Sequence, residues 1–244
     1  MKKLIFVIMA SALLLSCNRE NENMYENDLS DIATVDNSAQ STKFFLNLDN
    51  KERLYTMVSD LRYYRPKDGQ RVIANYVILS NKSDTSTYNH DVKLIDVYEI
   101  LTKGIFRIKP VQQDSIGNDQ IEIRQMWIGS DYLNVEFSYP GYNKIHFISL
   151  ISDSTKTYTD NKIHLEFRHN ANGDYPSISK WGMASFDLRS LQSNATNDSL
   201  QLVIHTKEYR STGDNTYSMT YKFNTPSLVS ARKISIPKNA EKAY

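Results

Sequence analysis

Short runs in which apolar and polar residues alternate recur through most of this chain. In YLNVEFSY (132–139) one face carries Leu133, Val135, Phe137 and Tyr139. The runs KIHLEF, QLVIHTKEY and YSMTYKF repeat the alternation. A period of two residues is typical of a strand buried on one face only. Two further runs, RVIANYVILS and HFISLIS, are apolar at nearly every position and predict strands covered on both faces.

Turn-forming dipeptides separate these runs. Asp-Gly, Asn-Gly, Gly-Asp and Pro-Gly pairs recur between them, and the chain uses 16 Tyr and 9 Phe residues. The stretch NHDVKLIDVYEILTKG (89–104) has mixed spacing, which predicts a strand followed by a short helical turn. We therefore predict an all-β protein.

A polar, turn-rich segment, QQDSIGNDQ (112–120), interrupts the β pattern. The chain beyond residue 41 is long enough for one large domain or two small ones with real cores. We place a domain boundary inside this segment. The predicted domains span residues 42–115 and 116–244.

The N-terminus carries an export signal. Lys2 and Lys3 precede an apolar run, residues 4–15, that is too short to span a membrane, which predicts a signal peptide over residues 1–16. Leu14-Leu15-Ser16-Cys17 resembles a bacterial lipobox, in which Cys17 becomes the acylated first residue of the mature protein. The alternative is that Cys17 is an apolar residue of an ordinary signal or tail anchor. Because Cys17 is the only cysteine, its acylation leaves no thiol for disulfides, thiol catalysis or metal binding.

Residues 17–41 are rich in Asn, Asp, Glu and Ser with single scattered apolar residues. Such a composition buries too little surface to offset ordering entropy, so we predict a flexible tether. Asn18 after the cysteine resembles an outer-membrane sorting signal. Glu20 and Glu22 resemble surface-export signals of Bacteroidetes lipoproteins, although Arg19 dilutes that acidic patch. We expect an outer-membrane lipoprotein, with surface exposure as a further expectation.

Five motifs follow the lipobox in a fixed order: RVIANY (71–76), DYLNV (131–135), HFISL (146–150), LEFRHN (165–170) and ASFDL (184–188). With the lipobox, this series resembles the NigD-like lipoproteins of Bacteroidetes. The resemblance implies an OB-like β-barrel in the N-terminal half and a β-sandwich in the C-terminal half. The family is named after a member linked to a bacteriocin gene cluster, for which a role in immunity was proposed. It supplies no catalytic residues to carry over.

The densest polar cluster is HLEFRHNANGD. His164 and Glu166 share a strand face and could both reach a metal ion, with His169 and Asp174 nearby. However, Arg168 on the same face would repel a cation. We therefore favour a solvated ladder of His164, Glu166 and Arg168 that ends in a hairpin turn at residues 172–173. We predict no metal site and no cofactor.

Candidate catalytic groups are few. His146 and His205 lie among apolar neighbours on predicted strands, which favours core or edge positions. No G-x-S-x-G elbow occurs in the sequence, and no carboxylate pair is placed as in a catalytic cleft. We predict that the protein is not an enzyme and that it has no catalytic residues.

One stretch, LRYYRPKDGQR (61–71), interleaves basic and aromatic residues, among them Arg62, Tyr63, Tyr64 and Arg65. An OB-like barrel can stack nucleic-acid bases on such aromatics. The net charge of +1 and the predicted export argue against a nucleic acid. We predict that these four residues contact a carbohydrate or a protein. The alternative is a hairpin turn at residues 68–69 with basic residues on its solvent face.

These features favour a non-enzymatic envelope lipoprotein that acts as a binding or interaction module. Its expected contacts are the lipid bilayer, through Cys17, and an envelope protein or a bacteriocin in an immunity role. The alternative is a glycan- or small-ligand-binding surface lipoprotein that assists nutrient uptake, and a purely structural envelope protein is a third class. Trp127 and Trp181 are candidate sugar-stacking platforms, although sandwich packing is the better explanation for at least one of them.

Overall fold

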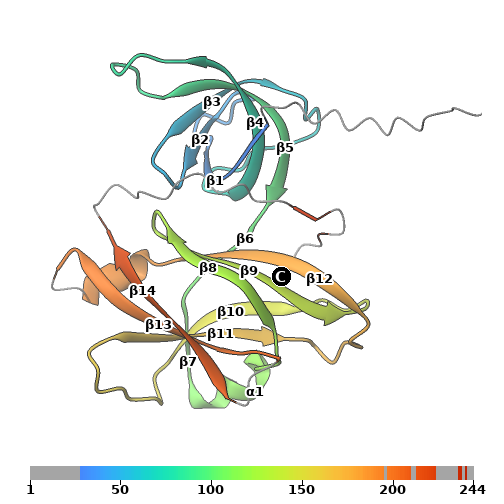
Figure 1. Cartoon of the computed structure of the whole chain (residues 1–244), viewed down its shortest axis with the longest axis vertical. Coiled ribbons are helices and arrows are strands. Elements are labelled where there is room, and N and C mark those ends of the chain that lie inside the picture. The colour runs from blue at the N-terminus through green and yellow to red at the C-terminus, as the bar shows by residue number, and fades with distance from the viewer. Residues whose placement is uncertain (1–27, 195–196, 210–212, 224–235, 238–239, 241–244) are drawn as a thin grey trace, which may run out of the picture.

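The computed structural model describes residues 28–194, 197–209, 213–223, 236, 237 and 240. These residues form an OB-like barrel followed by a β-sandwich, as predicted (Figure 1). The predicted signal peptide, Cys17 and the first part of the predicted tether lie outside the described residues. In the described part of the chain, no helix is long and apolar enough to cross a membrane.

Five strands close the barrel in the order β1-β2-β3-β5-β4. Their core consists of inward-facing aliphatic side chains such as Leu46, Leu54, Val92 and Leu94. The strands are β1 (Leu29–Asp36), β2 (Phe45–Leu48), β3 (Arg53–Ser59), β4 (Arg71–Asn81) and β5 (His90–Glu99).

Strand β4 contains the run that predicted a strand covered on both faces. Residues 71–74 are buried on both faces, because Val72 and Ala74 face the barrel core while Ile73 packs in a cluster that includes sandwich residues. Ile78 and Leu79, in the second half of the strand, are exposed. The prediction therefore holds only where β4 lies against the second domain.

Strand β1 corrects the prediction of a tether over residues 17–41. It pairs with both β2 and β4 and is an integral barrel strand. Ala33 and Val35 face the barrel core, whereas Ile32 packs in the cluster between the domains. The apolar residues of β1 form no single pattern because they pack in two different clusters.

The sandwich consists of two sheets. The five-stranded sheet has the order β14-β13-β11-β10-β7 and the four-stranded sheet the order β6-β12-β9-β8. Short helical turns connect some of the strands: η1 (Pro110–Gln112), α1 (Gln113–Ile116) and η2 (Arg189–Asn194). The strands are β6 (Leu101–Gly104), β7 (Phe106–Ile108), β8 (Glu122–Gly129), β9 (Tyr132–Gly141), β10 (Phe147–Asp153), β11 (Ile163–Asn170), β12 (Ile178–Asp187), β13 (Ser199–Lys207) and β14 (Asp214–Lys222).

The alternating face predicted for β9 forms part of the sandwich core, where Leu133, Val135 and Phe137 are buried. The opposite face is not solvated as the pattern predicted. Tyr132 and Asn134 are buried there, because the start of β9 lies under the barrel. A strand with an alternating sequence is thus covered on both sides at its first residues.

The domain boundary falls earlier than predicted. Strands β6 and β7 precede residue 115, yet they pair in parallel with β12 and β10 of the sandwich. The stretch 89–104 is therefore two strands of two domains, with only Ile100 between them, and contains no helical turn. The polar segment at 112–120 lies within the sandwich, in the connection between β7 and β8. Its turn residues follow the end of β7 and do not mark a domain boundary.

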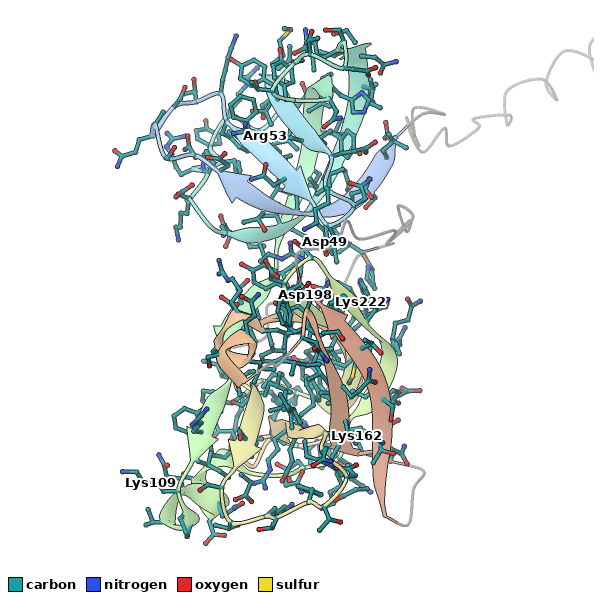
Figure 2. All side chains as sticks on the ribbon, turned by 90° about the vertical axis from the view of Figure 1, so that its left-hand side faces the viewer. Asp49, Arg53, Lys109, Lys162, Asp198 and Lys222 are labelled. Carbon is teal, nitrogen blue, oxygen red and sulfur yellow. The ribbon has the colours of Figure 1, made fainter. Side chains whose placement is uncertain are left out.

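A buried ion pair of the barrel lies at the junction with the sandwich. Arg71, the first residue of β4, forms two parallel hydrogen bonds to Asp49, with Nη1–Oδ1 2.7 Å and Nη2–Oδ2 2.8 Å. The Arg71 side chain is fully buried. It also donates to Asn134 of β9 at 3.2 Å, and its guanidinium lies 4.3 Å from the ring centre of Tyr132. Figure 2 shows Asp49 on the side of the barrel that faces the sandwich.

The sandwich completes the polar network. Asn134 donates through Nδ2 to Asp49 at 3.1 Å, and the Ser185 hydroxyl donates to Asn134 Oδ1 at 2.6 Å. Gly129 lies so close to this site that a Cβ atom there would overlap the Asp49 carboxylate. An apolar cluster beside the network, which includes Ile73 and Trp181, draws side chains from both domains.

Removing the Arg71 side chain should destabilise the whole chain. In Arg71→Met the Asp49 carboxylate stays buried without its cation, so we expect the free energy of unfolding to fall by about 3–5 kcal/mol. Denaturant unfolding measures this change. The control is Arg53→Met, because the Arg53–Asp36 pair is half-exposed and such pairs contribute about 1 kcal/mol or less. Equal losses for the two variants would contradict a special role for Arg71.

Candidate functional site

A groove of about 1180 Å³ opens on the barrel. Two connections and one strand line it: the β1–β2 loop, strand β3 and the β3–β4 connection. The lining residues are Asn37, Ser38, Gln40, Ser41, Thr42, Lys43, Phe44, Thr56, Met57, Ser59, Leu61, Arg62, Tyr64, Arg65, Pro66, Lys67 and Asp68.

Three of the four residues predicted to bind a ligand line this groove: Arg62, Tyr64 and Arg65. Tyr63 does not line it and is 89% exposed. The two tyrosines therefore differ in role. A turn does form at residues 67–70, with a positive φ at Gly69, but β3 and β4 do not pair, so the connection is no hairpin.

Tyr64 forms part of the groove floor. Its ring packs against Phe44 of the barrel core, with ring centres 6.0 Å apart. Its hydroxyl donates to Gln70 Oε1 at 3.3 Å. Burial raises the pKa of Tyr64 further above physiological pH, to about 12, and its neutral hydroxyl acts as a donor. Tyr64 is therefore held in place by the barrel core while it remains partly exposed in the groove.

Asn37 joins the two walls of the groove. Its backbone N–H donates to Asp68 Oδ1 at 2.8 Å and its Nδ2 donates to the Pro66 carbonyl at 3.1 Å. Its Oδ1 accepts the backbone N–H of Ser41 at 2.9 Å. Three hydrogen bonds thus fix both loops before any ligand arrives. Asn37 lies in the segment predicted as tether, and the sequence holds no signal for these contacts.

The groove carries excess positive charge. Four cationic side chains line it, and Asp68 is the only carboxylate among the lining residues. Arg65 donates to the Tyr64 carbonyl at 3.2 Å. None of the four cations, which are Lys43, Arg62, Arg65 and Lys67, forms an ion pair with a described residue. The nearby Asp60 carboxylate is held by Lys93 at 2.8 Å.

Comparison with known proteins identifies the family. Residues 32–100 match the NigD-like N-terminal OB domain, and residues 104–225 match the NigD-like C-terminal β-sandwich domain. This chain belongs to the NigD-like family. The predicted resemblance is therefore confirmed. Among curated proteins no relative matches the chain.

Several solved structures share the NigD-like fold. A protein of unknown function from Bacteroides vulgatus is 27% identical, with a TM-score of 0.71 over 81% of this chain and 92% of that one. A protein from Parabacteroides distasonis described as toxin-related is 30% identical, with a TM-score of 0.69 over 81% and 95%. A NigD-like immunity protein from Bacteroides caccae is 17% identical, with a TM-score of 0.61 over 80% and 96%, and shows the fold alone.

The two tryptophans of this NigD-like chain lie at the domain junction. Trp181 is buried, its Nε1 donates to Glu136 at 2.7 Å, and its ring meets Tyr98 edge to face at 5.3 Å. Trp127 packs partly buried against the same apolar cluster. Packing therefore accounts for both rings, and neither lines the groove.

The predicted ladder on β11 is buried rather than solvated. Glu166 pairs with Arg168 at 2.7 Å and with Lys156 at 2.7 Å. Both Glu166 and Arg168 are buried. The predicted turn forms at Asn172 and Gly173, which both have positive φ, but it joins strands of different sheets. Within the described ranges, no three His, Cys, Asp or Glu side chains are grouped to hold a metal ion.

Four of the five histidines form two chains of hydrogen bonds that the sequence did not reveal. In the first, Asp174 Oδ2 lies 3.1 Å from His146 Nε2, and His146 Nδ1 lies 2.7 Å from His169 Nε2. His169 Nδ1 must donate to the Gln120 carbonyl, 3.0 Å away. In the second, Asp160, His164 and His205 are linked in the same order, each link 2.9 Å long.

In the first hydrogen-bond chain, the bond from His169 to Gln120 determines which nitrogen of His169 carries the proton. Because His169 donates through Nδ1, its Nε2 accepts the proton of His146 Nδ1 when His169 is neutral. Burial lowers the pKa of His169 to about 4 and keeps it neutral. The pKa of Asp174 is also lowered: burial opposes its charge, but hydrogen bonds from Tyr142 N–H and His146 outweigh that effect. His146 Nε2 faces the Asp174 carboxylate, and both histidine rings are buried.

Acid should destabilise the sandwich through His169. The unfolded chain binds a proton at His169 below about pH 6.5, whereas the folded chain does so only near pH 4. Stability is therefore complete above pH 6.5 and falls as the pH drops, by about 3 kcal/mol at pH 4. Urea unfolding across this range measures the fall.

The variant His169→Gln keeps an acceptor for His146 but does not titrate, so it should lose most of this pH dependence. His205→Gln is the comparison, because the pKa of His205 is also lowered by burial but its ring is only partly buried. It should remove a smaller share. A pH dependence that both variants leave unchanged would contradict the assignment to His169.

Proposed function

We propose that this NigD-like chain is a non-enzymatic lipoprotein of the cell envelope, anchored through acylated Cys17, whose barrel groove binds a partner. One observation carries the proposal. Four cations surround the groove without ion-pair partners in the described structure, although the whole chain has a net charge of only +1. Charge concentrated in this way on a fixed concave surface favours binding of an acidic ligand.

The non-enzymatic character is supported by how the polar side chains are used. The buried histidines and carboxylates of the sandwich are engaged with one another, as in the Asp174–His146–His169 chain and the Glu166–Arg168 pair. They hold strands and loops together and do not line the groove. In the groove itself, the Tyr64 hydroxyl donates to Gln70 and Asp68 accepts the backbone N–H of Asn37.

Relatives suggest the physiological role. One solved structure of this fold is described as an immunity protein, and a 30% identical one as toxin-related. We propose that the module protects the cell from a bacteriocin by engaging either the toxin or its envelope target. The second candidate is a glycan- or small-ligand-binding lipoprotein that assists nutrient uptake. The hydroxyl and amide side chains of the groove favour it, since these groups can bond sugar hydroxyls.

Membrane attachment should depend on Cys17. In the native host, Cys17→Ser should move the protein from the membrane fraction to the soluble fraction, because it removes the acylation site. Cell fractionation measures the shift. A tag after Tyr244 then reports orientation: loss to external proteinase in sealed cells indicates the surface, whereas cleavage only after lysis indicates the periplasm. Membrane retention of Cys17→Ser would contradict the lipid anchor.

Protection should depend on the groove. We expect a deletion strain to become more sensitive to bacteriocin-producing neighbours, and the wild-type chain to restore resistance. Arg62→Ala/Arg65→Ala should fail to restore it, because these side chains supply half of the groove's cations. The matched control is Arg107→Ala/Arg124→Ala, which removes two exposed arginines of the sandwich. Survival assays give the readout, and full rescue by the groove variant would exclude this site.

A further inference from the structure

The polar and cationic side chains of the groove indicate the class of ligand that it binds. Its rim offers the hydroxyls of Ser38, Ser41, Thr42 and Ser59 and the amide of Gln40, together with the four cations. Hydroxyl and amide groups both donate and accept hydrogen bonds. A sugar hydroxyl does the same, whereas a carboxylate or phosphate only accepts. The groove therefore combines groups that suit sugar hydroxyls with cations that suit acidic substituents.

The size of the groove favours an extended ligand. Sites for drug-sized molecules occupy about 300–1000 Å³, and this groove, at about 1180 Å³, is larger. Its cations come from both walls, Lys43 from the β1–β2 loop and Arg62, Arg65 and Lys67 from the β3–β4 connection. A ligand that meets all of them must carry more than one acidic group along its length.

The walls are fixed in advance. Asn37 links them through Asp68 and Pro66, and Ser41 Oγ accepts the backbone N–H of Lys43 at 3.1 Å. Fixed loops lose little conformational entropy on binding. A nucleic acid is less well matched, because the stacking of successive bases needs several aromatic side chains. Tyr64 is the only tyrosine among the lining residues, and the exposed Tyr63 lies outside the groove.

We propose that the groove binds an acidic oligosaccharide, a chain of sugar units that carries several carboxylate or other anionic groups. This rests on the proposed function, in which the groove is the binding site. The sugar hydroxyls meet the serine, threonine and glutamine side chains, and the anionic groups meet Arg62, Arg65 and the two lysines. An acidic stretch of protein shares the charge but not the hydroxyl pattern, and the test separates the two.

The test is calorimetric titration of the full-length protein in detergent with an oligogalacturonate. The matched probe is its methyl ester, which has the same sugar backbone without charge. We expect the acid form to bind, the ester to bind at least about tenfold more weakly, and added salt to weaken the acid form. Free galacturonic acid should bind much more weakly than the oligomer. Equal binding of acid and ester would overturn the proposal, as would equal binding of acid monomer and oligomer.

Variants assign the binding to the groove. Arg62→Ala/Arg65→Ala should weaken binding by at least about tenfold, and Arg107→Ala/Arg124→Ala should leave it unchanged. Thermal unfolding checks that both variants fold. A polyglutamate peptide that binds as tightly as the oligogalacturonate would overturn the choice of a sugar. If no acidic oligosaccharide binds while the groove variant still loses protection in cells, this inference fails and the proposed function stands.

Discussion

The structure depends on a cation that has no access to water. Arg71 is fully buried, and the cost of removing its charge from solvent is offset by two hydrogen bonds to Asp49, by Asn134 and by the Tyr132 ring. Asp49 belongs to the barrel, whereas Asn134 and Tyr132 belong to the sandwich. The ion pair lies within the barrel, but the contacts to Asn134 and Tyr132 that cover it form only when the two domains are folded together. At Gly129 the backbone of the sandwich comes so close to the Asp49 side chain that a Cβ atom would not fit.

The start of β4, where Arg71 lies, and the end of β1 also position the groove. Arg71 directly follows the connection that carries Arg62, Arg65 and Lys67, and it bonds Thr34 near the end of β1 at 3.1 Å. Asn37, which ties the groove walls together, comes just after β1. Val35 N–H donates to the Gln70 carbonyl at 2.8 Å, so the two wall segments are tied at their bases as well. The end of β1 and the start of β4 thus contribute both to the groove and to the junction between the domains.

The local patterns predicted the β class well, because strand alternation is set by immediate neighbours. In contrast, the pattern does not predict β1, since Ile32 packs at the junction while Ala33 and Val35 pack in the barrel core, and neither set alone forms a complete strand pattern. The cluster around Arg62 was found because its residues are adjacent in sequence. The place of Asn37 in the groove has no local pattern, because it depends on contacts about 30 residues away. Lys43 lies in the same β1–β2 loop, far in sequence from the other cations. The histidine chains span similar separations.

Only Ile100 separates the last barrel strand from the first sandwich strand. The two halves match two family domains, yet we do not expect either to keep its structure when it is separated from the other. If the chain were cut at this point, Arg71 of the barrel would face solvent. Asn134 and Trp181 of the sandwich would lose the side chains that cover them. Expressing the barrel alone to study its groove would therefore alter the strand ends that shape it. In this protein the sandwich serves as scaffold for a site to which it contributes no lining residue.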